Sequence, residues 1–234
     1  MHKFGHIFLI SFLVLSGFDA NADGSVEAYE LTYVEQEPGA DPYQVKFLVT
    51  DRYLRIDHQG DQSGYIIYDD KQHLIHSVTH PDQSILVIKQ YDYQAPDLSR
   101  LVDLEYYVIP DAPKIAGKAI TSYRVTATGD AKEKCMDIKL AEGLLPEVAD
   151  ILTAYHKMLA GQQSRLLKTT PEEYRTSCFL YDQVFNKGDY YRKGLPIQEW
   201  HSNGKTRLLM SYKKVKVDAE LFQVEESYQQ YSLD

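Results

Sequence analysis

Three histidines within eight residues form the densest set of side chains in the sequence that could bind a metal ion. They are His73, His76 and His80. A step of three residues along a strand places His73 and His76 on opposite faces, and His80 falls in a turn. No cysteine or carboxylate completes a ligand set around them. We therefore predict no metal site and no cofactor, with a metal ion held by these histidines as the alternative.

Paired carboxylates and nucleophile motifs are the other features that could carry a reaction. Asp69 and Asp70 are adjacent, but they lie between Tyr68 and Lys71 at a strand end, a position typical of a turn. The sequence contains neither a G-x-S-x-G elbow nor an H-E-x-x-H helix. We predict that the protein has no catalytic residues and is not an enzyme. A secreted enzyme with an unrecognised site is the alternative.

The only two cysteines are Cys135 and Cys178. In an oxidising compartment, an even number of cysteines is most simply explained by a disulfide. A redox-active pair or a pair of metal ligands is the alternative, but neither has the C-x-x-C spacing that would favour it. The sequence therefore predicts a structural disulfide.

Tyrosine dominates the aromatic residues, with 19 tyrosines beside 8 phenylalanines and one tryptophan. A tyrosine has an apolar ring and a polar tip, which suit a half-exposed sheet surface or a wet pocket lining. Strands also favour aromatic residues for packing alone, so the composition does not decide between the two. If these side chains line a curved sheet beneath a helix, the space between them suits an acyl chain or an apolar peptide.

Residues 1–22 have the features of a secretory signal peptide. A start that contains Lys3 is followed by an apolar run at 7–18, and Ala20-Asn21-Ala22 supplies the small residues of a cleavage site. The apolar run has about a dozen residues, whereas a membrane-spanning helix needs about 20. We therefore predict cleavage after Ala22, a periplasmic location and no membrane-spanning segment in the mature chain.

Removal of residues 1–22 leaves residues 23–234, a length that one domain commonly occupies. The removed segment carries one lysine and one aspartate, so the mature chain keeps the net charge of −9. A negative charge of this size repels nucleic acid and anionic lipid at long range. We predict a single domain that does not bind nucleic acid.

Strand-length apolar runs alternate with turn residues over most of the mature chain. In the first half they lie at 29–34, 43–49, 53–57, 65–68, 74–78 and 85–88, which predicts an antiparallel meander. After Cys178 strand signals return at 179–185, 195–200, 207–212 and 215–217. Asn203-Gly204 between two of these runs is the strongest hairpin turn in the sequence.

A helical period interrupts the strands. From Leu145 to Leu159 the apolar residues recur at helical spacing, and Pro146 suits a first helical turn. We predict an amphipathic helix here, within a helical insertion at about 143–177. Strands on both sides of a helical segment indicate an α+β fold, which we expect to be an antiparallel, incompletely closed β-barrel whose curved sheet is covered by helices.

Several segments resemble the outer-membrane lipoprotein carrier superfamily. The early likeness consists of Tyr-Leu-Arg-Ile-Asp at 53–57, Gly-Tyr-Ile-Ile-Tyr-Asp at 64–69 and the strand at 85–88. The later likeness consists of Gly-Leu-Pro-Ile-Gln-Glu-Trp at 194–200 and Val-Asp-Ala-Glu-Leu-Phe at 217–222. The sequence departs from the family after Phe222, where Gln-Val-Glu-Glu replaces the usual apolar-Pro pair.

The resemblance implies a periplasmic, non-enzymatic carrier that holds a lipid or a lipid-modified protein inside an open barrel. Arg55 occupies a position where the carrier pattern often has an arginine. Together with the tyrosine and helix-stripe hypotheses, the resemblance predicts these ligand-binding residues: Arg55, Tyr65, Tyr68, Leu152, Tyr155 and Leu159. The alternative is a protein-interaction or envelope-stress sensing module of the same fold, with an envelope protein as its partner.

Overall fold

The computed structural model of the chain describes residues 24–58, 63–92, 102–103, 114–128 and 132–232. The predicted signal peptide at 1–22 lies outside the described residues. Within them, the strands are β1 (Ser25–Gln36), β2 (Tyr43–Val49), β3 (Tyr53–His58), β4 (Gly64–Asp69), β5 (Leu74–Thr79), β6 (Ser84–Lys89), β7 (Val102–Asp103), β8 (Ile120–Thr128), β9 (Lys132–Ala141), β10 (Leu195–His201), β11 (Thr206–Asp218) and β12 (Gln229–Ser232).

Helical elements lie between β9 and β10, with one further turn after β11. They are α1 (Pro146–Leu166), η2 (Leu167–Thr169), η3 (Glu172–Tyr174), α2 (Ser177–Leu180), the π-helical turn η4 (Tyr181–Phe185), η5 (Asp189–Arg192) and η6 (Ala219–Phe222). The chain thus has the α+β composition that the sequence predicts.

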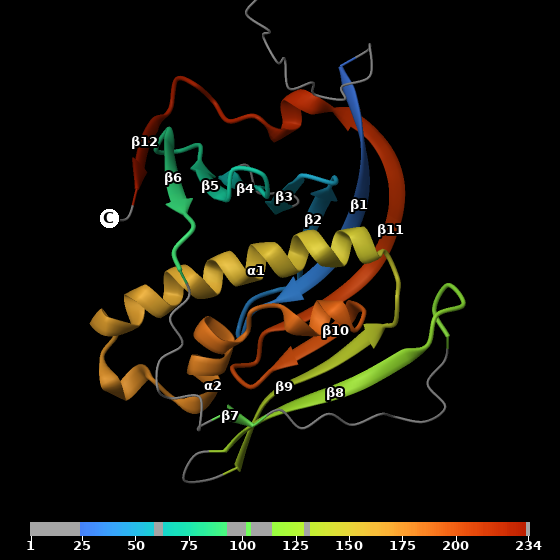
Figure 1. Cartoon of the computed structure of the whole chain (residues 1–234), viewed down its shortest axis with the longest axis vertical. Coiled ribbons are helices and arrows are strands. Elements are labelled where there is room, and N and C mark those ends of the chain that lie inside the picture. The colour runs from blue at the N-terminus through green and yellow to red at the C-terminus, as the bar shows by residue number, and fades with distance from the viewer. Residues whose placement is uncertain (1–23, 59–62, 93–101, 104–113, 129–131, 233–234) are drawn as a thin grey trace, which may run out of the picture.

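The strands form one twelve-stranded sheet in the order β12-β6-β5-β4-β3-β2-β1-β11-β10-β9-β8-β7. All neighbours pair antiparallel except β12 and β6, which are parallel. The predicted meander is confirmed, since β1 to β6 follow one another in both sequence and space. The sheet is open and curved, with β12 and β7 at its two edges (Figure 1).

The two halves of the sheet are joined by a long pairing between β1 and β11, which extends from Ser25 opposite Asp218 to Gln36 opposite Thr206. A tight turn brings β11 back from β10. Gly204 in this turn has φ 88°, a left-handed conformation that glycine adopts without steric cost. The hairpin predicted from Asn203-Gly204 is therefore confirmed.

Helix α1 lies across the concave side of the sheet, with β2–β6 on one side of it and β8–β10 on the other (Figure 1). The apolar stripe predicted from the sequence is buried against the sheet, and the helix continues to Leu166, past the predicted end at Leu159. Within the described residues, no helix combines the length and the apolar character needed to cross a membrane.

The helical segment is longer than the sequence indicates. Residues 179–185 were expected as a strand, and this prediction is wrong, because they belong to α2 and η4. Thr176 begins α2 by accepting a hydrogen bond from the Phe179 backbone N–H at 3.2 Å, which is a helix N-cap. Buried residues at 180, 181 and 184 repeat at helical spacing. With η5, helical structure continues to Arg192.

Candidate functional site

A first row of side chains crosses the concave face of the meander beneath α1. Residues that face each other across neighbouring strands in this row are Leu54, Tyr68, Ile75 and Ile88. All but Ile88 are fully buried. Tyr155 of α1 contacts this row, with its ring centroid 5.8 Å from that of Tyr68. The row therefore belongs to the core between sheet and helix.

A second row runs parallel to the first and is less covered. It starts at the buried Phe47 and continues through Ile56, Ile66, Ser77 and Leu86, all of which are partly exposed. We call Ile56, Ile66, Leu86 and Ile88 the apolar strip. A partly exposed strip of branched apolar side chains on a concave surface can hold an apolar ligand.

Four of the six residues predicted to bind a ligand meet on this concave side. Tyr68, Leu152 and Tyr155 are buried in the core, and Leu159 packs against it while remaining partly exposed. The Tyr68 hydroxyl donates to Asp70 Oδ1 at 2.7 Å. Burial raises the pKa of Tyr155 to about 12, so its phenol is neutral at physiological pH. The three buried side chains thus belong to the core between sheet and helix, and Leu159 lies at its margin.

The structure separates Arg55 and Tyr65 from those four residues. Successive residues of a strand point to opposite faces, so Arg55 and Tyr65 lie on the outer face of the meander. The Arg55 guanidinium lies 3.6 Å from the Tyr65 ring centroid and donates to the Leu221 carbonyl at 2.7 Å. The Tyr65 hydroxyl donates to Glu225 Oε2 at 2.6 Å. Both residues therefore hold the C-terminal segment and do not face α1.

An unpaired amide lies near the C-terminal end of α1. Gln162 is 2% exposed, and neither its Nε2 nor its Oε1 has a hydrogen-bond partner among the described residues. It follows Tyr155 by seven residues and Leu159 by three, so it continues the stripe that faces the sheet. Leaving a buried amide unpaired costs about 1–3 kcal/mol. A ligand that hydrogen-bonds to Gln162 would remove this cost.

A row of charged side chains, which the sequence analysis missed, crosses the centre of the concave face. Glu35 of β1 faces Arg207 of β11, which in turn faces Glu199 of β10. Arg207 Nη2 lies 2.6 Å from Glu35 Oε1, and Nη1 lies 3.5 Å from Glu199 Oε2. Both carboxylates are buried, at 4% and 3% exposure. We call these three residues the Glu–Arg–Glu row.

The charged forms of Glu35 and Arg207 are favoured within the row. Burial by itself would raise the pKa of Glu35, but Arg207 and Lys205 hold it below its ordinary value. Burial would lower the pKa of Arg207, but Glu199 and Glu35 raise it well above its usual range. Because Arg207 and Lys205 lower the pKa of Glu35, this carboxyl does not resemble the raised, proton-sharing carboxyl of a general acid.

Two tyrosines and a histidine cover the Glu–Arg–Glu row. The Tyr190 hydroxyl donates to Glu199 Oε1 at 3.2 Å, and the Tyr191 ring is stacked on Tyr190. The Tyr191 oxygen lies 3.2 Å from His156 Nε2. Burial lowers the pKa of His156 to about 3, so this histidine is neutral at physiological pH. Gly188, just before η5, lets the chain approach α1, since it has φ 72° and a Cβ there would lie 3.0 Å from His156.

A signal for this row is present in the sequence. Leu31, Tyr33 and Glu35 occupy alternate positions on β1, so Glu35 continues a buried apolar face. A charged residue in phase with buried neighbours indicates a buried ion pair. The partner cannot be read from spacing, because Arg207 lies 172 residues away.

The other residue types that could do chemistry have structural partners. Asp69 accepts from Arg52 Nη2 at 2.6 Å and from the backbone N–H groups of Lys71 and Gln72, so it shapes the predicted turn. His80 Nδ1 lies 2.9 Å from the Tyr228 hydroxyl. The part of the chain that the structure describes contains no group of three or more side chains that could hold a metal ion.

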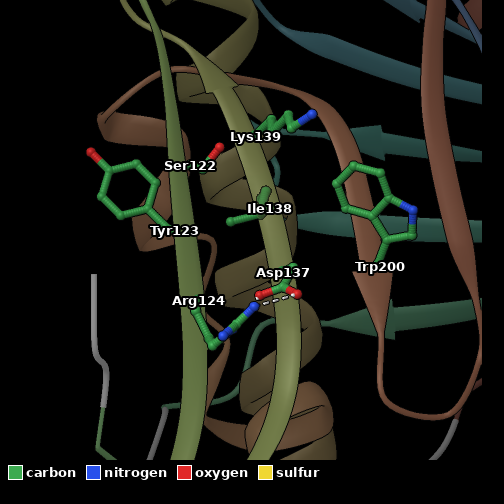
Figure 2. A pocket seen from close by; sticks show the side chains of 7 residues that line it. All are labelled: Ser122, Tyr123, Arg124, Asp137, Ile138, Lys139 and Trp200. Carbon is green, nitrogen blue, oxygen red and sulfur yellow. Dashed lines mark hydrogen bonds and ion pairs between the residues drawn. The ribbon is translucent and has the colours of Figure 1, made fainter. Parts of the chain in front are cut away.

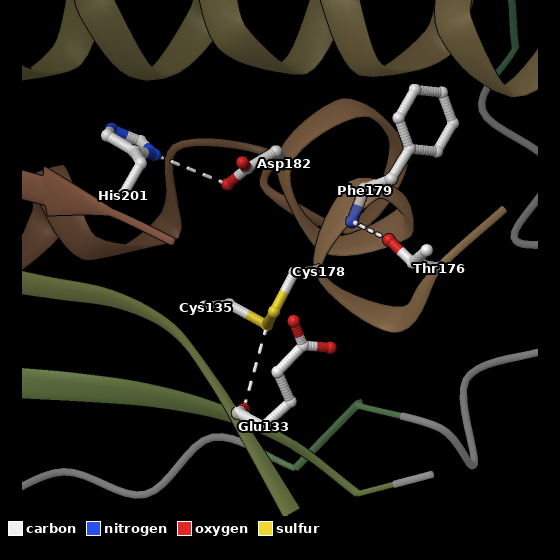
Figure 3. Close-up of a disulfide and its surroundings, with 7 residues drawn as sticks. All are labelled: Glu133, Cys135, Thr176, Cys178, Phe179, Asp182 and His201. Carbon is white, nitrogen blue, oxygen red and sulfur yellow. Dashed lines mark hydrogen bonds and ion pairs between the residues drawn. A yellow bond between two sulfur atoms is a disulfide. The ribbon is translucent and has the colours of Figure 1, made fainter. Parts of the chain in front are cut away.

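The predicted disulfide between Cys135 and Cys178 is confirmed (Figure 3). It joins β9 to α2, across a sequence separation of 43 residues. Nearby, His201 Nδ1 of β10 lies 3.4 Å from Asp182 Oδ1 of η4. These two links fix the helical segment to the sheet next to the Glu–Arg–Glu row.

The sequence matches no family model, and no curated protein matches it. Among solved structures, the chain is similar to an uncharacterized conserved protein from Thermus thermophilus, with 7% identity and a TM-score of 0.43 over 88% of this chain and 90% of that chain. It is also similar to PNGF-II in two crystal forms, with 11% and 10% identity and TM-scores of 0.40 and 0.42. The similarity to PNGF-II covers 89% of this chain but only 31% and 32% of the PNGF-II chain in the two crystal forms. None of these similarities assigns a function.

Proposed function

We propose that this protein is a non-enzymatic binding protein of the cell envelope that takes up an apolar or lipid-bearing ligand between the sheet and α1. In this proposal residues 1–22 direct export to the periplasm, and the curved sheet acts as an incompletely closed, carrier-like barrel. The proposal rests mainly on one observation, the unpaired Gln162 amide on the sheet-facing stripe of α1.

The concave side of the sheet and the Gln162 amide together suit a ligand with both apolar and polar parts. Leu159 and the apolar strip offer partly exposed aliphatic surface on the concave side. An amide can donate to a carbonyl and accept from an N–H, so it matches the ester or amide linkage of an acyl chain. Burial of each CH₂ group of such a chain contributes about 0.8 kcal/mol. A lipid or the acyl group of a lipid-modified protein therefore fits the site best.

The chemistry of the neighbouring charges favours binding over catalysis. Arg207 is shared between Glu35 and Glu199, and Tyr190 donates to Glu199. Neutral His156 contacts Tyr191. Because these groups are paired with one another, we expect them to form a rigid surface that a ligand can contact.

Native mass spectrometry of the mature protein purified from periplasm tests the proposal. We expect a stoichiometric ligand that solvent extraction and lipid analysis identify as a lipid or an acylated peptide. A protein that is recovered empty and gains no thermal stability from added fatty acids or lysolipids would contradict it.

A pair of variants on α1 sharpens this test. Gln162→Leu removes the unpaired amide, so it should raise the unfolding temperature while reducing the amount of bound ligand. Gln163→Leu is the matched control, because Gln163 is the next residue of α1 and its side chain is more exposed than that of Gln162. If both variants retain as much ligand as the wild type, Gln162 does not contact the ligand.

A second candidate function, a protein-interaction module, is favoured by the outer face of β11. Leu208 and Met210 are 38% and 58% exposed there, which is unusual for side chains of their size near the middle of a sheet. An envelope protein that docks on this face would bury them. Loss of a co-purifying protein from Met210→Lys, with unchanged lipid content, would support this function over the carrier function.

A further inference from the structure

A pocket of about 390 Å³ lies on the outer face of strands β8, β9 and β10. Figure 2 shows these strands in front of α1, and strand alternation places Ser122, Lys139 and Trp200 on the face away from the helix. The pocket thus opens on the face opposite the proposed ligand site, and the two sites can be tested independently. Its lining residues are Ser122, Tyr123, Arg124, Asp137, Ile138, Lys139 and Trp200.

The pocket contains a buried hydroxyl that has no partner. Ser122 is 9% exposed, and its Oγ forms no hydrogen bond with any residue that the structure describes. Ser122 lies directly opposite Lys139 in the β8–β9 register, so both side chains leave the sheet on the same face. A hydroxyl that is removed from water without a partner destabilises the fold unless a ligand satisfies it.

Lys139 supplies a positive charge beside an aromatic surface. Its Nζ lies 5.4 Å from the Trp200 ring centroid, and no carboxylate among the described residues lies within ion-pair distance of it. The one carboxylate in the pocket, Asp137, accepts hydrogen bonds from both Arg124 and Lys134. The charge of Lys139 is therefore not balanced within the pocket.

Trp200 provides a flat apolar wall. It is 37% exposed, so part of its indole is accessible at the pocket. It faces Asp137 in the β9–β10 register, on the same face of the sheet as Lys139. An aromatic wall, a cation and a hydroxyl thus meet in one pocket.

We propose that this pocket binds a small organic anion with a flat apolar body. The body lies against the Trp200 indole, and the anionic group accepts hydrogen bonds from the Lys139 ammonium and the Ser122 hydroxyl. Aromatic carboxylates and aryl phosphates share this chemistry. The ligand differs from the lipid of the proposed function in size, charge and the face of the sheet that it occupies.

Trp200 is the only tryptophan in the sequence, so intrinsic tryptophan fluorescence reports on this pocket alone. We would titrate the mature protein with benzoate, phenyl phosphate, benzyl alcohol and inorganic phosphate, with excitation at wavelengths that tyrosine does not absorb. Benzoate or phenyl phosphate should give a saturable change in emission. Benzyl alcohol, which lacks the anion, and inorganic phosphate, which lacks the flat body, should bind at least fivefold more weakly.

Two variants and one control connect the binding to named atoms. Lys139→Gln should weaken binding of the better anion at least fivefold. Ser122→Ala should also weaken binding, yet it should raise the urea midpoint of unfolding because it removes an unpaired buried hydroxyl. Lys216→Gln on β11 removes the same charge from an exposed position outside the pocket and should bind as the wild type does.

The shift of the single indole N–H signal in ¹⁵N NMR spectra gives a second measure of binding. No saturable change with either anion would overturn the proposal. Equal affinity for benzoate and benzyl alcohol would overturn the assignment to anions. Equal weakening by Lys139→Gln and Lys216→Gln would show that only the overall charge matters, and that outcome would also contradict the proposed site.

Discussion

Glu35 and Arg207 face each other across β1 and β11, and their side chains form a contact of 2.6 Å in the interior of the protein. Glu199 approaches the same guanidinium from β10. A buried ion pair is not in itself a source of stability, because both charges lose their hydration. Once formed, however, it fixes the register of three strands, because a slip of one residue would bury unpaired charges.

Replacement of Arg207 by Met should lower the free energy of unfolding by about 3–5 kcal/mol, because it leaves the buried Glu199 carboxylate without its cation and Glu35 with Lys205 alone. Urea denaturation followed by circular dichroism measures the change. Arg192→Met is the matched control, since Arg192 is exposed, and we expect its effect to stay within about 0.5 kcal/mol. If Arg207→Met and Arg192→Met lower the free energy of unfolding by the same amount, the pairing of Arg207 within the Glu–Arg–Glu row does not account for the loss.

Loss of the disulfide should destabilise the fold. For a loop of 43 residues, the chain-entropy model gives about 4 kcal/mol, and measured values are commonly about 2–4 kcal/mol. We expect Cys135→Ala combined with Cys178→Ala to unfold at lower denaturant concentration, and a reductant to produce the same shift in the wild type. Unfolding that does not respond to reductant would show that the bridge adds nothing to stability.

The stability of the protein should depend on pH through His156. Burial lowers its folded pKa to about 3 from the ordinary value of 6.5. Between these values the unfolded chain binds a proton that the folded chain does not, so stability falls as the pH falls. The slope from one such group is at most about 1.4 kcal/mol per pH unit.

The variant His156→Gln should reduce this slope between pH 4.5 and 6.5, as measured by urea unfolding at several pH values. Burial also lowers the pKa of His76, so His76→Gln should act in the same direction. His73→Asn is the control, because His73 is exposed. A slope that is unchanged in His156→Gln would mean that the imidazole is hydrated in the folded protein.

The variant Arg55→Gln should loosen the C-terminal segment without changing ligand content. The guanidinium holds the Leu221 carbonyl and stacks on Tyr65, and both contacts are lost in the variant. We expect faster proteolysis within 219–228 and a loss of about 1–3 kcal/mol in stability. If ligand is lost while the segment keeps its protease resistance, Arg55 instead contacts the ligand, as the carrier resemblance implies.

Local features of the sequence were sufficient for much of the fold. Alternation of apolar residues predicted β1 to β6, Asn203-Gly204 predicted the β10–β11 turn, and a helical period predicted α1. The segment at 179–185 was assigned wrongly because its apolar residues suit either a buried strand or a short helix. The N-cap at Thr176 and the link through Cys178 decided for the helix.

The sequence by itself predicted strands β1 to β6, the β10–β11 turn, helix α1 and the pairing of the two cysteines. Turn chemistry and residue period act over short distances along the chain, and an even cysteine count needs no strand register. Tertiary structure decided which faces meet. It placed Tyr68 beneath α1 but Arg55 beneath the C-terminal segment, and it brought Arg207 to Glu35 across 172 residues. The physical reason is that strand period fixes only the alternation of faces, whereas the partner of each face depends on long-range pairing.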